Sequence, residues 1–540
     1  MKKKILLTGL CLFWLAGCDL VGEDDPGENT DPCLLDPASC EAVESGEFGT
    51  VTLESTSTDD VFLVWVQSVP TTPSVADNYI TFSLDGGGGS ASALTASGSS
   101  SQGLRWGGQA QIDFDNQRHA AIGRLVKDMQ RGERRVVPLM RPLAGTHPCA
   151  SDEVPHDNGC VGELSLNWGQ DGARNFIVQE MVEQGDERFY VLVDEADVAT
   201  AADARAAAVQ FASTFDKEHQ LLALNGHTGT LDHNSDGAIT LAFSNHTGGG
   251  VSASVVGFFD YRDMLPSADA EATGNEMDIL WARPPSASVP AGLTVATLAH
   301  EYSHLASFAL RVSAQGTSAT QEALWLDEGI AHTIEDLTGW GPSNIDAVEA
   351  TLQDWADTAL AGPLDSIANR GMAYLFLRHL IDSRAKANGA SSAQSSQVED
   401  AAAEILGGMM QESTSGFEHP YLKSLSRTQH ANWVLGVYAT GGSYLDSTQR
   451  ADFLAPGTAE TGNQCGIDTH GTFTNASGDS VALDGPASDD LDDLTEIFEG
   501  EVLESGSILL LVTELEPGSH EIKASADDAI TLRLQAERVE

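Results

Sequence analysis

The segment His300-Glu301-Tyr302-Ser303-His304 places two imidazoles and a carboxylate within five positions of the chain. On an α-helix the two histidines lie one turn apart on the same face, where both can ligate one metal ion. A catalytic zinc ion takes three protein ligands and leaves one position open for water. Glu301 lies about 100° around the helix from His300, so it points at the open position. The pattern predicts His300 and His304 as zinc ligands and Glu301 as a general base.

The surrounding sequence predicts that this motif lies on a buried helix. Apolar residues precede and follow it from Leu293 to Ala309, and neither Pro nor Gly occurs between positions 293 and 315. Two histidines and a glutamate on one buried turn are costly without a metal, because buried polar groups need partners. The alternative is that each histidine bonds a carbonyl or carboxylate in the core.

A third ligand is expected on a second helix downstream. This helix is predicted to begin after Thr320, an N-cap residue, and to end at Gly339. Glu328 is the candidate ligand, 24 positions after His304, which leaves room for the chain to turn and cross the metal. Asp327 is the competing ligand, and a solvated helix face is the alternative for both acids.

These residues resemble a known group of enzymes. His300-Glu301-x-x-His304 followed by Trp325-Leu326-Asp327-Glu328-Gly329-Ile330-Ala331 resembles the gluzincins, and within them the hyicolysin family of bacterial metallopeptidases. Weaker similarities flank the motif and extend the resemblance over roughly residues 185 to 385: segments 232–243, 256–260, 275–280 and 371–377.

The resemblance implies that His300, His304 and Glu328 bind Zn²⁺ and that Glu301 is the general base of a gluzincin-type metallopeptidase, expected to act as an endopeptidase. A peptide or protein is then the substrate, held in extended form along the edge strand of the sheet above the metal helix. A peptidase fold that binds a ligand or partner without turnover is the alternative.

Two positions depart from the family pattern. His332 stands where many gluzincins have an acid that orients a ligand histidine, so Glu335 or Asp336 is expected to supply that carboxylate. Ala368 stands where related aminopeptidases have a tyrosine that stabilises the oxyanion. Tyr374 is the candidate replacement, and a core tyrosine is the alternative.

The expected fold class is α+β. The resemblance implies a zincin-like catalytic domain over residues 181–460, with a mixed β-sheet over the metal-binding helix and a mostly helical lower subdomain. β-rich modules are expected to flank it: an N-terminal region at 45–180, in which 86–103 is a linker or long loop, and a β-sandwich-like module at 461–540.

The first residues predict export. A basic start and a short apolar run are typical of a signal peptide, and residues 1–17 resemble a bacterial lipoprotein signal that ends before Cys18. Cys18 is then lipidated, residues 18–44 form an acidic tether, and the protein is anchored to a membrane in the periplasm or at the cell surface.

Cysteine spacing agrees with an oxidising compartment. Cys33 with Cys40, and Cys149 with Cys160, are spaced for small disulfide loops, which leaves Cys465 without a partner. No pair has the Cys-x-x-Cys spacing of a cysteine zinc site.

The charge of the chain limits its partners. A net charge of −52, with 28 basic residues against 80 acidic ones, argues against nucleic-acid binding and against electrostatic docking on anionic lipid.

Asp232-x-Asn234-x-Asp236-Gly237 imitates the start of an EF-hand loop, but the twelfth position is Phe243 rather than glutamate. Ca²⁺ in another geometry is the remaining expectation there.

Overall fold

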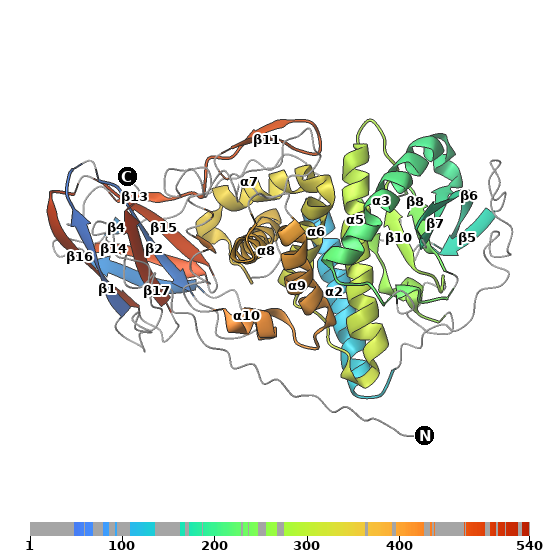
Figure 1. The fold of residues 1–540 in the computed structure, drawn as a ribbon, viewed down its shortest axis with the longest axis horizontal. Coiled ribbons are helices and arrows are strands. Elements are labelled where there is room, and N and C mark those ends of the chain that lie inside the picture. The colour runs from blue at the N-terminus through green and yellow to red at the C-terminus, as the bar shows by residue number, and fades with distance from the viewer. Residues whose placement is uncertain are drawn as a thin grey trace, which may run out of the picture.

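The described chain forms one six-stranded sheet, a helical region and a β-sandwich, as the computed structural model shows (Figure 1). The structure describes residues 48–68 without 59, 79–85, 92–93, 108–134, 163–167, 172–227 without 186, 231–246 without 236, 255–266, 275–361, 366–390, 396–425, 471–491, 497–503, 506–526 without 514 and 532–538, together with 433, 434, 437 and 469. Helices and strands are both abundant there, which confirms the α+β class.

The six-stranded sheet is mixed and has the order β5-β6-β7-β8-β10-β9. Its strands are β5 (Glu163–Asn167), β6 (Ala173–Gln184), β7 (Glu187–Asp194), β8 (Ile239–Phe243), β9 (Gly257–Phe259) and β10 (Ile279–Ala282). β7, β8 and β10 run parallel, and the other pairs are antiparallel, so β9 is an antiparallel strand at one edge. The central strands are continuous apolar runs because both faces are covered.

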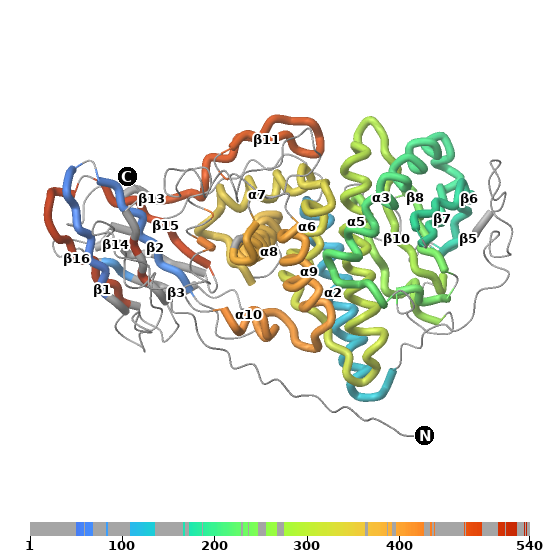
Figure 2. Tube along the Cα trace, in the orientation of Figure 1, coloured from blue at the N-terminus to red at the C-terminus, as the bar shows by residue number. Residues whose placement is uncertain are grey.

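Helices cover one face of this sheet and continue into the helical region (Figure 2). The α-helices are α2 (Gln109–Gln130), α3 (Ala201–Leu221), α5 (Ala291–Ser307), α6 (Leu324–Glu335), α7 (Ile345–Gln353), α8 (Ile367–Ala387), α9 (Ser396–Gln411) and α10 (Pro420–Ser424). α3 and α5 pack on the sheet, α5 packs on α6, and α6 and α7 pack on α8. The main hydrophobic core joins all of these elements.

The helix predicted around the histidine motif is present as α5, which ends in a π-helical turn, Phe308–Val312. The second predicted helix is present as α6. Its N-cap is Ala323 rather than Thr320. Gly339 adopts a φ of 104°, which ends the following turn as a glycine at that position can.

The β-sandwich is built from both ends of the described chain. One sheet has the order β1-β16-β3-β14-β4 and the other β13-β15-β2-β17. These strands are β1 (Phe48–Ser55), β2 (Phe62–Ser68), β3 (Tyr79–Asp85), β4 (Ser92–Ala93), β13 (Asp489–Leu491), β14 (Ile497–Leu503), β15 (Ser507–Val512), β16 (Gly518–Ala526) and β17 (Leu532–Arg538). A separate hairpin consists of β11 (Thr472–Thr474) and β12 (Ser480–Ala482).

This pairing corrects the domain boundaries expected from the sequence. The regions 45–180 and 461–540 are not separate β modules, because β2 pairs with β15 and β17, and β3 pairs with β14 and β16. The boundary at 181 falls inside β6, which forms a hairpin with β7 in the six-stranded sheet. Region 45–180 also contains α2, a helix of 22 residues that the sequence analysis does not predict.

Several sequence predictions fall outside the described residues. They concern the signal peptide, the lipidated Cys18, the acidic tether and the cysteine pairs 33/40 and 149/160. Within the described part of the chain, every helix is too short or too polar to cross a lipid bilayer.

Gly371 shows how closely α7 and α8 approach each other. A Cβ at Gly371 would overlap the hydroxyl of Thr351 and the carbonyl oxygen of Ala347. We expect Gly371→Ala to lower the free energy of unfolding by about 1–3 kcal/mol, because the helices must separate. Gly408→Ala is the matched control, since a Cβ there meets open space, and it should stabilise the helix by about 0.5–1 kcal/mol. Urea unfolding measures both, and equal effects would contradict this packing.

Candidate metal centre

Among the described residues, two groups of side chains could hold a metal ion, and the first is His300, His304 and Glu328. α5 supplies the two histidines one turn apart, and α6 crosses it and supplies Glu328. All three side chains are buried or nearly so. The structure therefore brings together the three ligands predicted from the sequence.

The distances within this group fit a tetrahedral metal ion. His300 Nε2 lies 3.1 Å from His304 Nε2, His300 Nε2 lies 3.4 Å from Glu328 Oε2, and His304 Nε2 lies 3.6 Å from Glu328 Oε1. Two ligands that each bind one zinc ion at about 2.0–2.1 Å in tetrahedral geometry are about 3.3–3.4 Å apart. The three side chains thus form a triangular face of the required size, and both histidines present the same ring nitrogen.

In the second group, His300, His332 and Glu335, the polar atoms lie closer together than the edges of such a face. Glu335 Oε1 lies 2.6 Å from His300 Nδ1 and 3.1 Å from His332 Nδ1. These are hydrogen-bond distances, and the first is too short for two ligands of one metal. His332 Nδ1 also lies 2.8 Å from Asn344 Oδ1. We therefore interpret Glu335 as the partner of the histidines.

Each ligand of the first group is held by a second residue. Glu335 bonds Nδ1 of His300, as one of the two alternatives from the sequence predicts. Asp327 Oδ2 lies 3.0 Å from His304 Nδ1, so Asp327, the competing candidate ligand, instead pairs with a histidine of the group. These carboxylates leave Nε2 of each histidine free to face the metal position.

The third ligand, Glu328, is held by a cation. Arg370 Nη1 of α8 lies 3.3 Å from Glu328 Oε2, and Arg370 Nη2 lies 2.5 Å from Asp115 Oδ2 of α2. Burial would raise the pKa of Glu328, but the charges of Arg370 and of the two histidines lower it well below its usual range. Glu328 is therefore a carboxylate in this setting, which is the form that binds a metal.

Without a metal, protons on the two histidines neutralise the charge of the neighbouring carboxylates. Burial disfavours a charged His300, but hydrogen bonds to Glu328 and Glu335 raise its pKa well above the usual value. Burial also opposes the charge on His304, and Asp327 and Glu328 outweigh it and raise the pKa of His304 to about 9. A dication between the two Nε2 atoms would take the place of these protons.

Glu301 is held beside the ligands and against the edge strand. Its Oε2 accepts a hydrogen bond of 2.8 Å from the backbone N–H of Phe259 in β9. Burial raises the pKa of Glu301 to about 7, against the charges of His300 and His304. A carboxyl group with a pKa near neutrality can both take up and release a proton at physiological pH.

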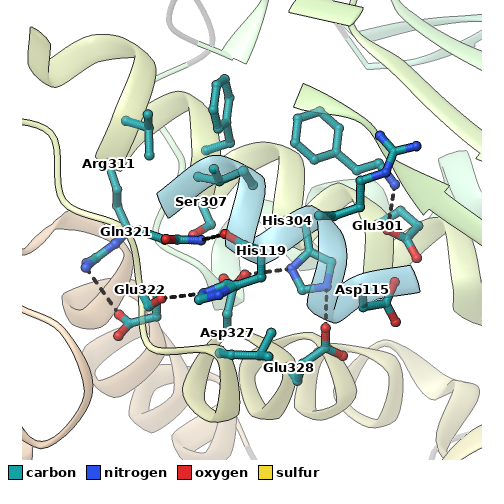
Figure 3. Close-up of a pocket in the computed structure, with 16 residues that line it drawn as sticks. Asp115, His119, Glu301, His304, Ser307, Arg311, Gln321, Glu322, Asp327 and Glu328 are labelled. Atoms are coloured by element: carbon teal, nitrogen blue, oxygen red, sulfur yellow. Dashed lines mark hydrogen bonds and ion pairs between the residues drawn. The ribbon is translucent and has the colours of Figure 1, made fainter. Parts of the chain in front are cut away.

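α2 adds residues that the sequence analysis missed. Asp115, Arg118, His119 and Ile122 of α2 line a pocket together with Glu301, His304 and Glu328. Figure 3 shows Asp115 and His119 projecting from α2 into the space that Glu301 and His304 also face. No motif identifies these α2 residues, because an acid, two bases and an isoleucine on a helix have no distinctive spacing.

Tyr374, the candidate oxyanion donor, is not among the residues that line this pocket. Its side chain lies in the core beside Asp336, where burial and the charge of Asp336 raise its pKa well above the usual value. Asp336 follows Glu328 by eight residues, which is roughly 12 Å along a helix. The structure therefore places Tyr374 as the core tyrosine of the alternative interpretation. Ala368 is likewise buried in the core.

The expected calcium loop is only partly described. Asp232 Oδ2 accepts a hydrogen bond of 3.0 Å from the backbone N–H of Gly237, as in a turn. Asp236 lies outside the described residues, so Ca²⁺ binding at this loop stays a prediction.

Comparisons with known proteins give no match for this chain: no family model matches the sequence, and no curated protein matches it.

Loss of the carboxylate behind His300 should weaken metal binding. We expect Glu335→Ala to lower zinc affinity roughly 10- to 100-fold, because the imidazole loses the group that fixes its orientation. Glu404→Ala, which removes an exposed acid paired with Arg384 on the protein surface, is the control and should bind zinc as the unmodified protein does. Competition with a chromophoric chelator measures both affinities. Equal affinities would show that Glu335 does not orient a ligand.

Zinc affinity should rise with pH. Below their raised pKa values, His300 and His304 carry protons that must leave before a metal binds. The apparent affinity should therefore increase roughly tenfold per pH unit for each proton displaced between pH 6 and 8, and fall as the pH is lowered. Chelator competition at pH 6, 7 and 8 tests this expectation. An affinity independent of pH would exclude these histidines as ligands.

Proposed function

We propose that this protein is a zinc-dependent peptidase with a zincin-like catalytic domain. The observation that carries the proposal is the triangle of His300 Nε2, His304 Nε2 and a Glu328 oxygen, whose edges of 3.1–3.6 Å fit one tetrahedral ion. The donor set of two imidazoles and one carboxylate is one that catalytic zinc uses, with a fourth position left for water.

A zinc ion held by these residues would polarise a substrate carbonyl and lower the pKa of its bound water to about 7. Glu301 takes a proton from the attacking water and delivers it to the leaving amine. Its pKa of about 7 suits both transfers. The backbone N–H of Phe259 holds one oxygen of Glu301, which fixes the carboxyl group between the metal position and the edge strand.

The choice of a peptide as substrate is supported by the neighbourhood of the site. β9 is an edge strand of the mixed sheet, and Phe259 in it contacts the proposed general base. An extended peptide can add to such an edge through its backbone, which places a peptide bond beside Glu301. The resemblance of the motif to gluzincins supports the same class. The lipid anchor, the extracytoplasmic location and endopeptidase action belong to this proposal.

One observation favours a second candidate, a peptidase fold that binds a ligand without turnover. No tyrosine is among the residues that line the described pocket, and Tyr374 lies in the core. Ser307, Arg311 and Gln321, which line the pocket outside α2, remain as side-chain donors for an oxyanion. The intact Glu301 beside the ligands supports the enzyme.

Glu301→Gln separates the two candidates. The amide keeps the size of the side chain but cannot accept the proton, so hydrolysis of a casein or peptide-library substrate should fall at least about 100-fold, while zinc content and Tm stay close to those of the unmodified protein. Glu404→Gln on the surface of α9 is the control. Turnover that survives Glu301→Gln would overturn the mechanism, and a zinc-loaded protein that never hydrolyses peptides would support the binding protein.

A further inference from the structure

The pocket over the metal centre is too small for a peptide in this structure. Its cavity volume is about 50 Å³, enough for a few water molecules, whereas ligand sites usually offer about 300–1,000 Å³. Four residues of α2 form part of its wall. α2 thus occupies space that a substrate beside Glu301 would need.

α2 also occupies the edge of β9. The side-chain amide of Gln111 donates to the carbonyl oxygen of Gly257 at 3.1 Å and accepts from the backbone N–H of Val256 at 3.1 Å. A carboxamide presents the same donor and acceptor as a peptide unit, and its bond to Gly257 occupies a carbonyl oxygen of β9 that an added peptide would bond. Glu301 accepts a hydrogen bond from the backbone N–H of Phe259. The backbone N–H groups of Val256 and Phe259 and the carbonyl oxygen of Gly257 are therefore already hydrogen-bonded.

The two halves of α2 are attached differently. The C-terminal half buries Leu125, Val126 and Met129 in the main core. The N-terminal half buries Ile112 and Phe114 outside the main core. It is also held by polar contacts, in which Asp115 pairs with Arg370 and Arg118 pairs with Asp260. Phe114 adds an aromatic contact with Phe258, with ring centroids 5.0 Å apart.

We propose that the N-terminal half of α2 competes with the substrate inside the same molecule. Gln111 holds the backbone position on β9 that an extended peptide takes when this half of the helix moves away, and Phe114 holds the place of an apolar side chain of that peptide. The C-terminal half stays anchored in the core. This inference rests on the proposed function, because it explains how the same site is kept closed.

Gln111→Ala in the full-length, zinc-loaded protein tests the competition. The change removes the hydrogen bonds to Val256 and to Gly257 of β9 and weakens the closed form. KM for an unstructured fluorogenic peptide with apolar side chains should therefore fall roughly three- to thirtyfold. kcat and zinc content should not fall. Gln109→Ala is the matched control, since Gln109 is exposed on the same helix and bonds only Asp113 in the described structure; its KM should be unchanged. An unchanged or higher KM in Gln111→Ala would overturn the proposal.

Hydrogen–deuterium exchange gives a readout that does not need turnover. In the zinc-loaded Glu301→Gln protein, addition of the same peptide should speed exchange of the backbone amides of residues 109–119 and leave those of 123–130 protected. Unchanged or slower exchange of 109–119 would show that α2 is a fixed wall of the site. This result stands apart from the proposed function, which fails if the unmodified protein binds no zinc or hydrolyses no peptide.

Discussion

Charge balance around α5 and α6 constrains this structure more than any other feature. Asp115, Glu301, Asp327, Glu328 and Glu335 are gathered around two imidazoles, and all five carboxyl groups are largely withdrawn from water. Buried carboxylates are stable only when opposite charges or hydrogen-bond donors face them. Arg370 supplies one cation, and protons on His300 and His304 or a dication between them supply the rest.

This constraint explains why the site depends on several elements. α5 presents the histidines and Glu301, α6 presents Glu328 with Asp327 and Glu335, α8 presents Arg370, and α2 presents Asp115. The sheet contributes one backbone N–H, from Phe259, that holds Glu301. Because each acid is paired with a group on a different element, a shift of α2 or α8 reaches Glu328 through Arg370.

The sequence predicts the part of the site that has a fixed spacing. His300, Glu301 and His304 follow from helical geometry, and Glu328 follows from the resemblance and from the second helix. α2 is not predicted for a physical reason. Its N-terminal half buries the polar Gln111 together with Ile112 and Phe114 and directs Asp115 and Arg118 toward the pocket, so the usual apolar period is interrupted.

Long-range pairing is the other feature that the sequence cannot supply. Short apolar runs mark β2 and β15 as strands, but no local signal shows that residues more than 400 positions apart are neighbours in one sandwich. Tyr374 illustrates the same difficulty at the site. Its position one helical turn after Gly371 makes it the candidate replacement for the family's tyrosine, whereas α8 places it beside Asp336.

X-ray absorption at the zinc edge of the purified protein tests the central claim most directly, because it reports the ligands of the metal itself. We expect one zinc ion per chain, bound by two imidazole nitrogens and by carboxylate and water oxygens at about 2.0–2.1 Å, with no sulfur ligand. The spectrum should lose imidazole scattering when His300 is replaced by alanine. A zinc-free protein, or a shell containing sulfur or lacking imidazole, would contradict the account.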